Sequence, residues 1–225
     1  MEKLIKEYKF CLKDKKFLLA SFVSVLFLAI SLFVNFYAGV YATESASNPV
    51  TDIILNNIPI YHLDDVFIIG SWIFVIFIFV LCFTEPKRLP FTVKTIALFV
   101  LIRAIFITLT HLGPFPNTIL ANPSGLISYF VFGGDLFFSG HTGLPFLLSL
   151  VFWEQIWLRF TFIALSIIFA IVVLLAHLHY SIDVLAAFFI TYTIFKIALI
   201  FFKKDRAEFF KYDRINLNAK TSPKN

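Results

Sequence analysis

Two histidines stand in short polar motifs within an otherwise apolar chain. His141 lies in the sequence GGDLFFSGHTG at residues 133–143, and His179 lies in HLHYSID at residues 177–183. Ionisable side chains in or beside apolar spans are costly to bury, so they are candidates for function. Two histidines with different partners suit phosphoryl-type transfer, in which one attacks phosphorus while the other donates and later accepts a proton.

His179 and Asp183 are four residues apart. On a helix this spacing puts the carboxylate one turn from the imidazole, where it can accept a ring N–H. Such a bond would fix the tautomer of His179 and leave its other nitrogen as a base or nucleophile. A capped helix start with an incidental pair is the alternative interpretation.

Ser139 and Gly140 precede His141 where we expect a loop to turn into a helix. The free N–H groups and the dipole of a helix start attract anions, and Gly lets the backbone approach a phosphate. A Ser at this position is also an ordinary N-cap.

Zinc is a competing interpretation of the histidines, but the chain has no HExxH or cysteine pattern. We therefore predict no metal and no cofactor.

The elements that position these residues are expected to be membrane helices. Of the 225 residues, 60% are apolar and 15% are charged, and mean hydropathy is +0.88. Ordinary soluble domains have about 45–50% apolar and about 25% charged residues. This composition excludes a secreted scaffold, a disordered chain and a typical nucleic-acid binder, and it indicates a polytopic membrane protein.

We expect an all-α fold of six transmembrane helices in one bundle. A hydrocarbon core of about 30 Å needs about 20 helical residues. The expected spans are 17–40, 66–83, 92–112, 141–153, 159–177 and 180–202. The fourth reaches only about 20 Å. The aromatic stretch at 126–132 is therefore expected beside it as an interfacial or re-entrant piece, with a recess above the short helix.

The basic residues predict that both termini are cytoplasmic, because basic loops stay on that side. Of 19 Lys and Arg residues, six lie in 1–16, three in 87–94, one is Arg159 and seven lie in 203–224. The opposite segments contain none; they are 41–65, 113–140 and 178–181. Both histidine motifs are thus expected on the non-cytosolic face, periplasmic in a bacterium and luminal or exoplasmic in a eukaryote.

Three parts of the chain are expected: a cytoplasmic interfacial segment at 1–16, a six-span catalytic membrane domain at 17–202, and a basic cytoplasmic tail at 203–225. In the first part, an apolar stripe favours a helix lying in the membrane interface. A solvated positive flank is the alternative. Cys11 and Cys82 fall on the cytoplasmic side and are expected to be free thiols.

The motifs GDLFFSGHTG and AHLHYSIDVLAAFFIT resemble the sphingomyelin synthase branch of the type 2 phosphatidic acid phosphatase superfamily. The sequence LIRAIFITLTHLGPFP at 101–116 is similar to the Arg-containing segment of that family, and Pro49 and Asp52 resemble its first outer loop more faintly. Two positions depart from the family patterns. Val173 stands where the phosphatase branch has Arg, and Gly133 stands where the synthase branch often has Cys.

The resemblance implies roles for the motif residues. By it, His179 is the nucleophile that forms a phosphohistidine, Asp183 orients it, and His141 is the general acid and base. The implied substrate-binding residues are Arg103, Asp135, Ser139, Gly140 and Tyr180. His111 and His177 receive no role.

A charge argument favours a phosphodiester substrate. A phosphomonoester carries about −1.5 to −2 charges at neutral pH, by analogy with phosphorylated side chains, whereas a diester headgroup carries one. Arg103 is the fixed cation nearest the outer half of the bundle; it is expected to reach the phosphate from beneath or to pair with Asp183. We therefore predict transfer of a phospho-headgroup from a glycerophospholipid donor to a ceramide-like or diacylglycerol-like alcohol.

Three alternatives stay open at this stage. Water as acceptor would make the protein a phospholipase C-type hydrolase, and a monoester substrate would make it a lipid phosphate phosphatase. A non-catalytic transporter or membrane scaffold is the alternative from another class. The expected partners are membrane lipids and no nucleic acid, and the oligomeric state is left open.

Overall fold

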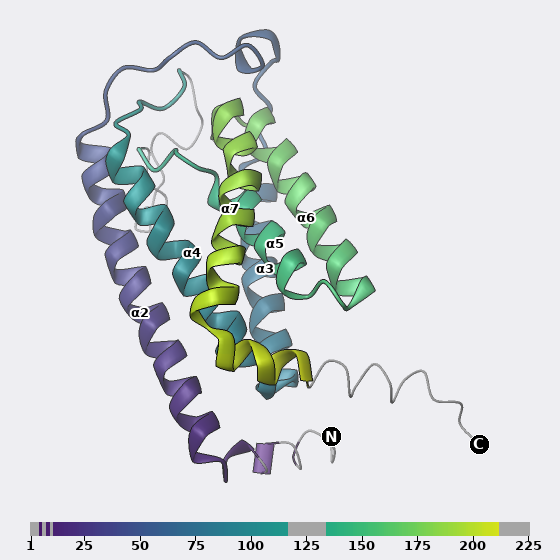
Figure 1. The fold of residues 1–225 in the computed structure, drawn as a ribbon. Coiled ribbons are helices and arrows are strands. Elements are labelled where there is room, and N and C mark those ends of the chain that lie inside the picture. The colour runs from purple at the N-terminus through teal and green to yellow at the C-terminus, as the bar shows by residue number, and fades with distance from the viewer. Residues whose placement is uncertain (1–4, 6–7, 10, 117–133, 212–225) are drawn as a thin grey trace.

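The computed structural model describes residues 5, 8–9, 11–116 and 134–211, and the described part is helical without a strand. Six helices and two short 3-10 helices are described from end to end (Figure 1). The helices are α2 (Lys15–Glu44), α3 (Asp64–Thr84), α4 (Leu89–Leu109), α5 (Gly140–Val151), α6 (Ile156–Leu175) and α7 (Ser181–Phe201), and the 3-10 helices are η1 (Leu55–Asn57) and η2 (Pro86–Arg88). The expected all-α fold is confirmed for these residues.

Five helices are long and apolar enough to cross a membrane, namely α2, α3, α4 with η2, α6 and α7. These helices indicate an integral membrane protein. The fourth expected span, 141–153, corresponds to α5, whose 12 residues extend about 18 Å. The aromatic stretch at 126–132 lies outside the described residues. Six complete crossings and the side on which the termini lie remain predictions.

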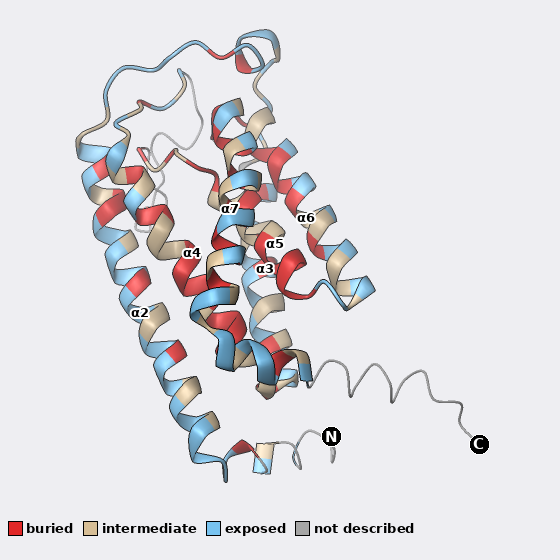
Figure 2. Ribbon diagram, in the orientation of Figure 1, coloured by how far each residue is buried: buried red, intermediate tan, exposed pale blue. Residues whose placement is uncertain are grey.

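Helix α2 stands at one edge of the bundle and packs mainly on α4. Its buried side chains are small, and Ser24, Ser31 and Ala38 recur every seventh residue. Seven residues are close to two helical turns, so these side chains share one face. Figure 2 shows this face as isolated buried positions on an otherwise exposed helix. Small side chains thus let α2 lie close to α4.

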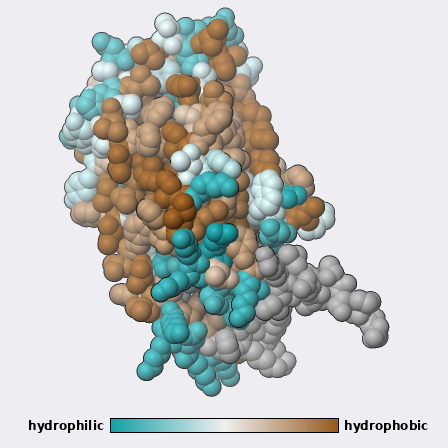
Figure 3. Space-filling view, in the orientation of Figure 1, coloured by the Kyte–Doolittle hydropathy of each residue, from teal (hydrophilic) through white to brown (hydrophobic). Residues whose placement is uncertain are grey.

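The core lies between α4, α5, α6 and α7. Helix α5 contacts all three of the others, and buried Phe99, Leu147 and Phe162 belong to one continuous apolar cluster. Large apolar side chains such as Phe79 and Phe189 point outward, as in a protein whose solvent is lipid. Figure 3 shows this apolar surface over the helices, with hydrophilic residues gathered where α2 begins and α7 ends.

The basic segment after α7 starts as a helical stretch over 203–211. Phe209 is fully buried and lies 5.5 Å from Phe91 and 5.7 Å from Phe152 between ring centroids. Lys94 of α4 and Asp205 form an ion pair of 2.6 Å. This part of the expected tail is therefore packed onto the bundle.

The segment before α2 contacts the end of α3. The Tyr8 hydroxyl donates a hydrogen bond of 2.7 Å to the Phe83 carbonyl. Cys11 and Cys82 are both buried, and they form no disulfide with each other, as expected. Much of 1–10 lies outside the described residues, so the interfacial helix remains a prediction.

Candidate active site

The two histidine motifs meet at one end of the bundle, which we call the site end, where α2, α4 and α6 end and α5 and α7 begin (Figure 1). The Ser139 N–H donates a hydrogen bond of 3.2 Å to the backbone carbonyl of Asp183. This bond joins the start of α5 directly to the first turn of α7. Two residues that are 44 positions apart in the sequence are thereby brought into one site.

His179 is buried and held by a backbone carbonyl. Its Nδ1 lies 2.9 Å from the Leu136 carbonyl oxygen and 3.6 Å from Asp183 Oδ2. A carbonyl oxygen can only accept, so this hydrogen bond places the proton on Nδ1 and leaves Nε2 of the neutral ring with its lone pair. The carboxylate lies at ion-pair distance, beyond the usual length of an N–H···O bond. We expected Asp183 to fix the tautomer of His179, but the hydrogen bond that fixes it is made with the Leu136 carbonyl.

Asp183 is fully buried in the first turn of α7. Its Oδ2 accepts a hydrogen bond of 3.0 Å from the Tyr180 N–H. A carboxylate at a helix N-terminus is stabilised by the free N–H groups and the dipole. Asp183 is therefore placed as a negative charge beside His179.

His141 is the second residue of α5 and is half-buried. Its ring centroid lies 4.3 Å from that of Phe67 on α3 and 5.8 Å from that of Phe169 on α6. Its electrostatic environment includes His179 and Arg103. Packing thus fixes His141 in the same site as the other histidine.

Ser139 is the N-cap of α5, because its Oγ accepts a hydrogen bond of 3.3 Å from the Thr142 N–H. The next residue, Gly140, packs against Arg103. A Cβ at Gly140 would lie 3.0 Å from Arg103 Nε, which is tighter than ordinary van der Waals contact. We expected the absence of a side chain at Gly140 to leave room for a phosphate. In the structure it leaves room for the guanidinium of Arg103.

Arg103 is paired with Asp135. Its Nη1 donates to Asp135 Oδ2 at 2.9 Å, its Nη2 lies 2.6 Å from Oδ1, and its Nε donates to the Phe138 carbonyl at 2.9 Å. The structure thus pairs Arg103 with Asp135 and not with Asp183, whereas contact with a phosphate from beneath stays a prediction. The two-pronged fit of guanidinium to carboxylate explains the choice of Asp135.

Tyr180 occupies a different place from the other predicted substrate-binding residues. Its side chain is 1% exposed, and its hydroxyl donates to the Gly113 carbonyl at 2.8 Å and accepts from the Val50 N–H at 3.2 Å. Both capacities of the hydroxyl are thus used inside the protein. This geometry gives Tyr180 a structural role in place of the expected substrate contact.

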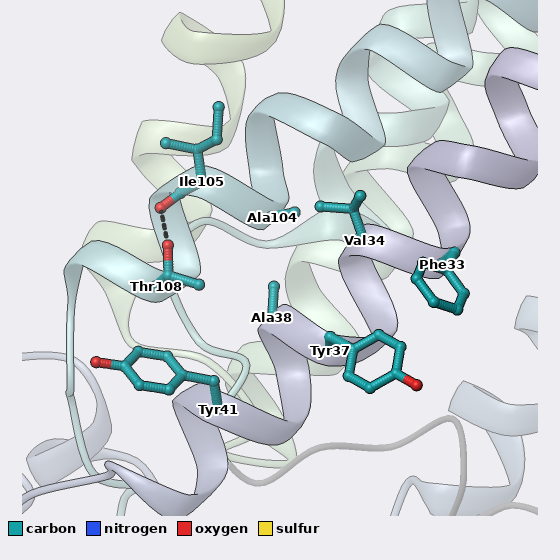
Figure 4. Close-up of a pocket in the computed structure, with 8 residues that line it drawn as sticks. All are labelled: Phe33, Val34, Tyr37, Ala38, Tyr41, Ala104, Ile105 and Thr108. Carbon is teal, nitrogen blue, oxygen red and sulfur yellow. Dashed lines mark hydrogen bonds between the residues drawn. The ribbon is translucent and has the colours of Figure 1, made fainter.

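A separate hollow of about 440 Å³ lies between α2 and α4 (Figure 4). None of its lining residues belongs to the histidine motifs. It is lined by Phe33, Val34, Tyr37, Ala38, Tyr41, Ala104, Ile105 and Thr108. The candidate active site is therefore defined by its side chains and helix starts, and this hollow is distinct from it.

Residues 133–200 match the family described as PAP2 superfamily C-terminal. The match supports the type 2 phosphatidic acid phosphatase superfamily. Members of this superfamily are lipid phosphatases or phosphotransferases, so the match supports enzymatic chemistry on lipid phosphates. It contains both histidine motifs, whereas Arg103 and Asp52 precede it. No curated protein and no solved structure matches the chain.

Within this superfamily segment, the Leu136 carbonyl is a feature that sequence reasoning missed. It is a backbone group in a loop 43 residues before His179. Every residue type has a backbone carbonyl oxygen, so no pattern of side chains could reveal this contact. Only the path of residues 134–139, just before α5, places it against the ring.

His177 has a structural explanation. It has a positive φ of 54° at the end of α6, where the Leu178 N–H donates to the Val173 carbonyl at 2.8 Å. This is the left-handed turn that commonly ends a helix. Burial against Phe115 lowers the pKa of His177, while the backbone of Ile58 and the charge of Asp52 oppose that shift.

Among the described residues, no group of three or more His, Cys, Asp and Glu is arranged to hold a metal ion.

Proposed function

We propose that the protein moves a phospho-headgroup from a glycerophospholipid to a lipid alcohol through a phosphohistidine at His179. One observation carries this proposal: the Nδ1 of His179 is engaged by Leu136 at 2.9 Å, so Nε2 is the nitrogen that can attack. The superfamily match supports lipid phosphate chemistry of this kind at the coarser level. The alcohol is ceramide-like or diacylglycerol-like.

In the first step, His179 Nε2 attacks the phosphorus of the donor. An N–P bond forms as the P–O bond to diacylglycerol breaks, and His141 gives a proton to the departing oxygen. The ring of His179 becomes cationic during this step. Asp183 Oδ2, at 3.6 Å from Nδ1, stabilises that charge electrostatically.

In the second step, the acceptor hydroxyl gives its proton to His141 and its oxygen attacks the same phosphorus. The N–P bond breaks, and His179 returns to its neutral form. Water in place of the alcohol would complete the same cycle as a hydrolysis. The acceptor therefore decides between transferase and hydrolase, and the two histidines serve both.

The Arg103–Asp135 pair supports a monoanionic diester as substrate. The chain has no Lys or Arg other than Arg103 between residues 95 and 158, and Asp135 compensates that one cation. A dianionic monoester would therefore bring about two uncompensated charges to a half-buried site, whereas a diester brings one. The N–H groups at the start of α5 are suited to hold that single charge.

We place the site on the non-cytosolic face. This part of the proposal is supported by the charge distribution, because exposed basic residues lie at the opposite end of the bundle, where Figure 3 shows a hydrophilic surface. They include Lys15, Lys16, Lys203, Lys204 and Arg206. Basic segments are retained in the cytoplasm, which leaves the histidine motifs outside it.

The test is a lipid assay with purified protein. Phosphatidylcholine or phosphatidylethanolamine labelled in the headgroup is supplied with and without ceramide or fluorescent diacylglycerol. We expect label on the added alcohol, no transfer by His179→Ala, and unchanged transfer by the exposed control His62→Ala. Free labelled headgroup as the only product would establish the hydrolase instead. Release of inorganic phosphate from phosphatidic acid, with no action on diesters, would establish the phosphatase.

A further inference from the structure

Asp52, in the loop between α2 and α3, is buried and accepts four hydrogen bonds. Its Oδ1 accepts from the N–H groups of Ile54 at 2.8 Å and Leu55 at 3.0 Å. Its Oδ2 accepts from the N–H of Ser181 at 2.7 Å and from the Ser181 hydroxyl at 2.8 Å. One carboxylate thus joins the loop to the first residue of α7, 129 positions later in the sequence.

Ser181 lies between His179 and Asp183, the two residues that we assign to the chemistry. The first N–H groups of a helix have no partner within it, and Asp52 supplies one from another segment. Its negative charge also complements the dipole at the start of α7. Hydrogen bonds hold the Asp52 carboxylate ionised, since they keep its pKa below the usual value although burial alone would raise it.

The same loop contacts this segment at two other points. The Val50 N–H donates to the Tyr180 hydroxyl at 3.2 Å, and the Tyr61 N–H donates to the Leu175 carbonyl at 2.9 Å. Together with Asp52, these bonds attach the loop on both sides of His179. The position of that ring against Leu136 therefore depends on the loop as well as on α7.

We propose that Asp52 is a positioning residue for the reaction at His179, acting through Ser181. Its carboxylate fixes the start of α7 so that the His179 ring stays against the Leu136 carbonyl and beside Asp183. This role rests on the proposed function of His179. It requires that Asp52 itself does not contact the substrate.

Two substitutions remove the contact from opposite sides. Asp52→Asn keeps the shape but has a single acceptor oxygen, so it cannot receive all four hydrogen bonds. Ser181→Pro removes both donors of Ser181, and Pro is well suited to the first position of a helix. Tyr180 already has the extended conformation, φ −69° and ψ 156°, that the residue before Pro prefers. Ser181→Pro therefore tests the contact even where Asp52→Asn fails to fold. Asp65→Asn is the control at an exposed carboxylate.

We expect kcat to fall by about 10- to 100-fold in both variants, because misplacement of a reacting group by about 1 Å costs up to about 100-fold. KM should stay near the wild-type value, since substrate contacts are unchanged. A merely structural role would lower the amount of folded protein and leave kcat per folded molecule unchanged. Wild-type kcat in folded Asp52→Asn and Ser181→Pro would overturn the proposal.

A second readout does not depend on activity. Diethyl pyrocarbonate modifies accessible neutral imidazoles, and His179 is 6% exposed whereas His62 is exposed. Both variants should raise the labelling rate of His179 relative to His62 within the same molecule. If the wild-type protein turns over no lipid, the proposed function fails, and this labelling ratio alone decides the role of Asp52. An unchanged ratio in that case rejects it.

Discussion

Arg103 of α4 and Asp135 of the loop before α5 form an ion pair with two contacts, of 2.9 and 2.6 Å. Both side chains are largely buried, and the guanidinium lies against Gly140 at the start of α5. The pair therefore holds the loop that carries Leu136 and contributes almost no net charge to the site. We therefore expect this pair to control which substrate charge the site prefers.

Asp135→Asn should shift substrate preference toward phosphomonoesters. The substitution leaves the Arg103 cation uncompensated, and an extra positive charge stabilises a dianion more than a monoanion. The ratio of kcat/KM for phosphatidic acid to that for phosphatidylcholine should rise by about tenfold, which corresponds to about 1.4 kcal/mol. Parallel assays of the two lipids measure it.

The exposed Asp65→Asn is the control for the change in total charge. Asp135→Asn is also expected to lower thermal stability in detergent, because breaking a buried ion pair costs about 3–5 kcal/mol. The ratio of the two substrates is independent of the amount of folded enzyme. An unchanged or lower ratio would contradict the role given to the pair.

Asp183→Asn should lower kcat without abolishing it. In a triad whose carboxylate fixes the histidine tautomer, the same substitution costs about 10⁴-fold. Here the Leu136 carbonyl fixes the tautomer, so only the electrostatic effect of Asp183 is lost. We expect a decrease of about 10²-fold in kcat.

Single-turnover measurement of labelled phosphohistidine, followed by its acid lability, locates this effect in the first step. His179→Ala serves as the reference for a site without nucleophile. A loss in Asp183→Asn as large as in His179→Ala would show that Leu136 does not hold the tautomer by itself.

The spacing of the motifs predicts the chemistry better than it predicts the contacts. His179 and Asp183 are near each other because four residues make about one helical turn, and α5 is short because its apolar run is short. These properties are local, so the sequence contains them. The start of α5 is likewise readable as a Ser N-cap, which the Ser139–Thr142 bond confirms.

The remaining contacts depend on how distant segments meet. Arg103 had two expected partners, but the structure pairs it with Asp135 in the loop before α5, and its guanidinium packs against Gly140 at the start of that helix. Tyr180 is turned inward by hydrogen bonds with Gly113 and Val50, which come from two other segments at the site end. Asp52 had only a faint family resemblance, and its hydrogen bonds to Ser181 appear only in three dimensions.

His141→Ala should be most damaging for substrates with a poor leaving group. A general acid contributes about 10²- to 10⁴-fold when the departing oxygen is basic, as in diacylglycerol, and less when it is acidic. With p-nitrophenyl phosphocholine, the first-turnover release of nitrophenol by His141→Ala should therefore stay near that of the wild type. Rapid-mixing absorbance measures this burst.

The comparison between the two donors is made within one variant, so it is insensitive to partial misfolding. Phe67→Leu, which changes a ring that packs on His141 without removing the imidazole, serves as a packing control. Equal losses of His141→Ala on the phospholipid and on the nitrophenyl ester would reject proton donation to the leaving group.

His177→Asn should make the protein less sensitive to acid. Burial holds the pKa of His177 below its usual value, whereas in the unfolded chain the group titrates near about 6.5. As pH falls below about 6.5, the unfolded chain therefore binds a proton that the folded protein does not, and stability decreases toward the folded pKa; above about 6.5 this group has no effect.

Asn does not titrate and tolerates the positive φ of 54° at this position. Thermal unfolding in detergent at pH 5 and pH 7.5 should thus differ less in His177→Asn than in wild type, while the exposed control His62→Asn keeps the wild-type difference. The same difference in His177→Asn as in wild type would mean that other groups cause the acid sensitivity.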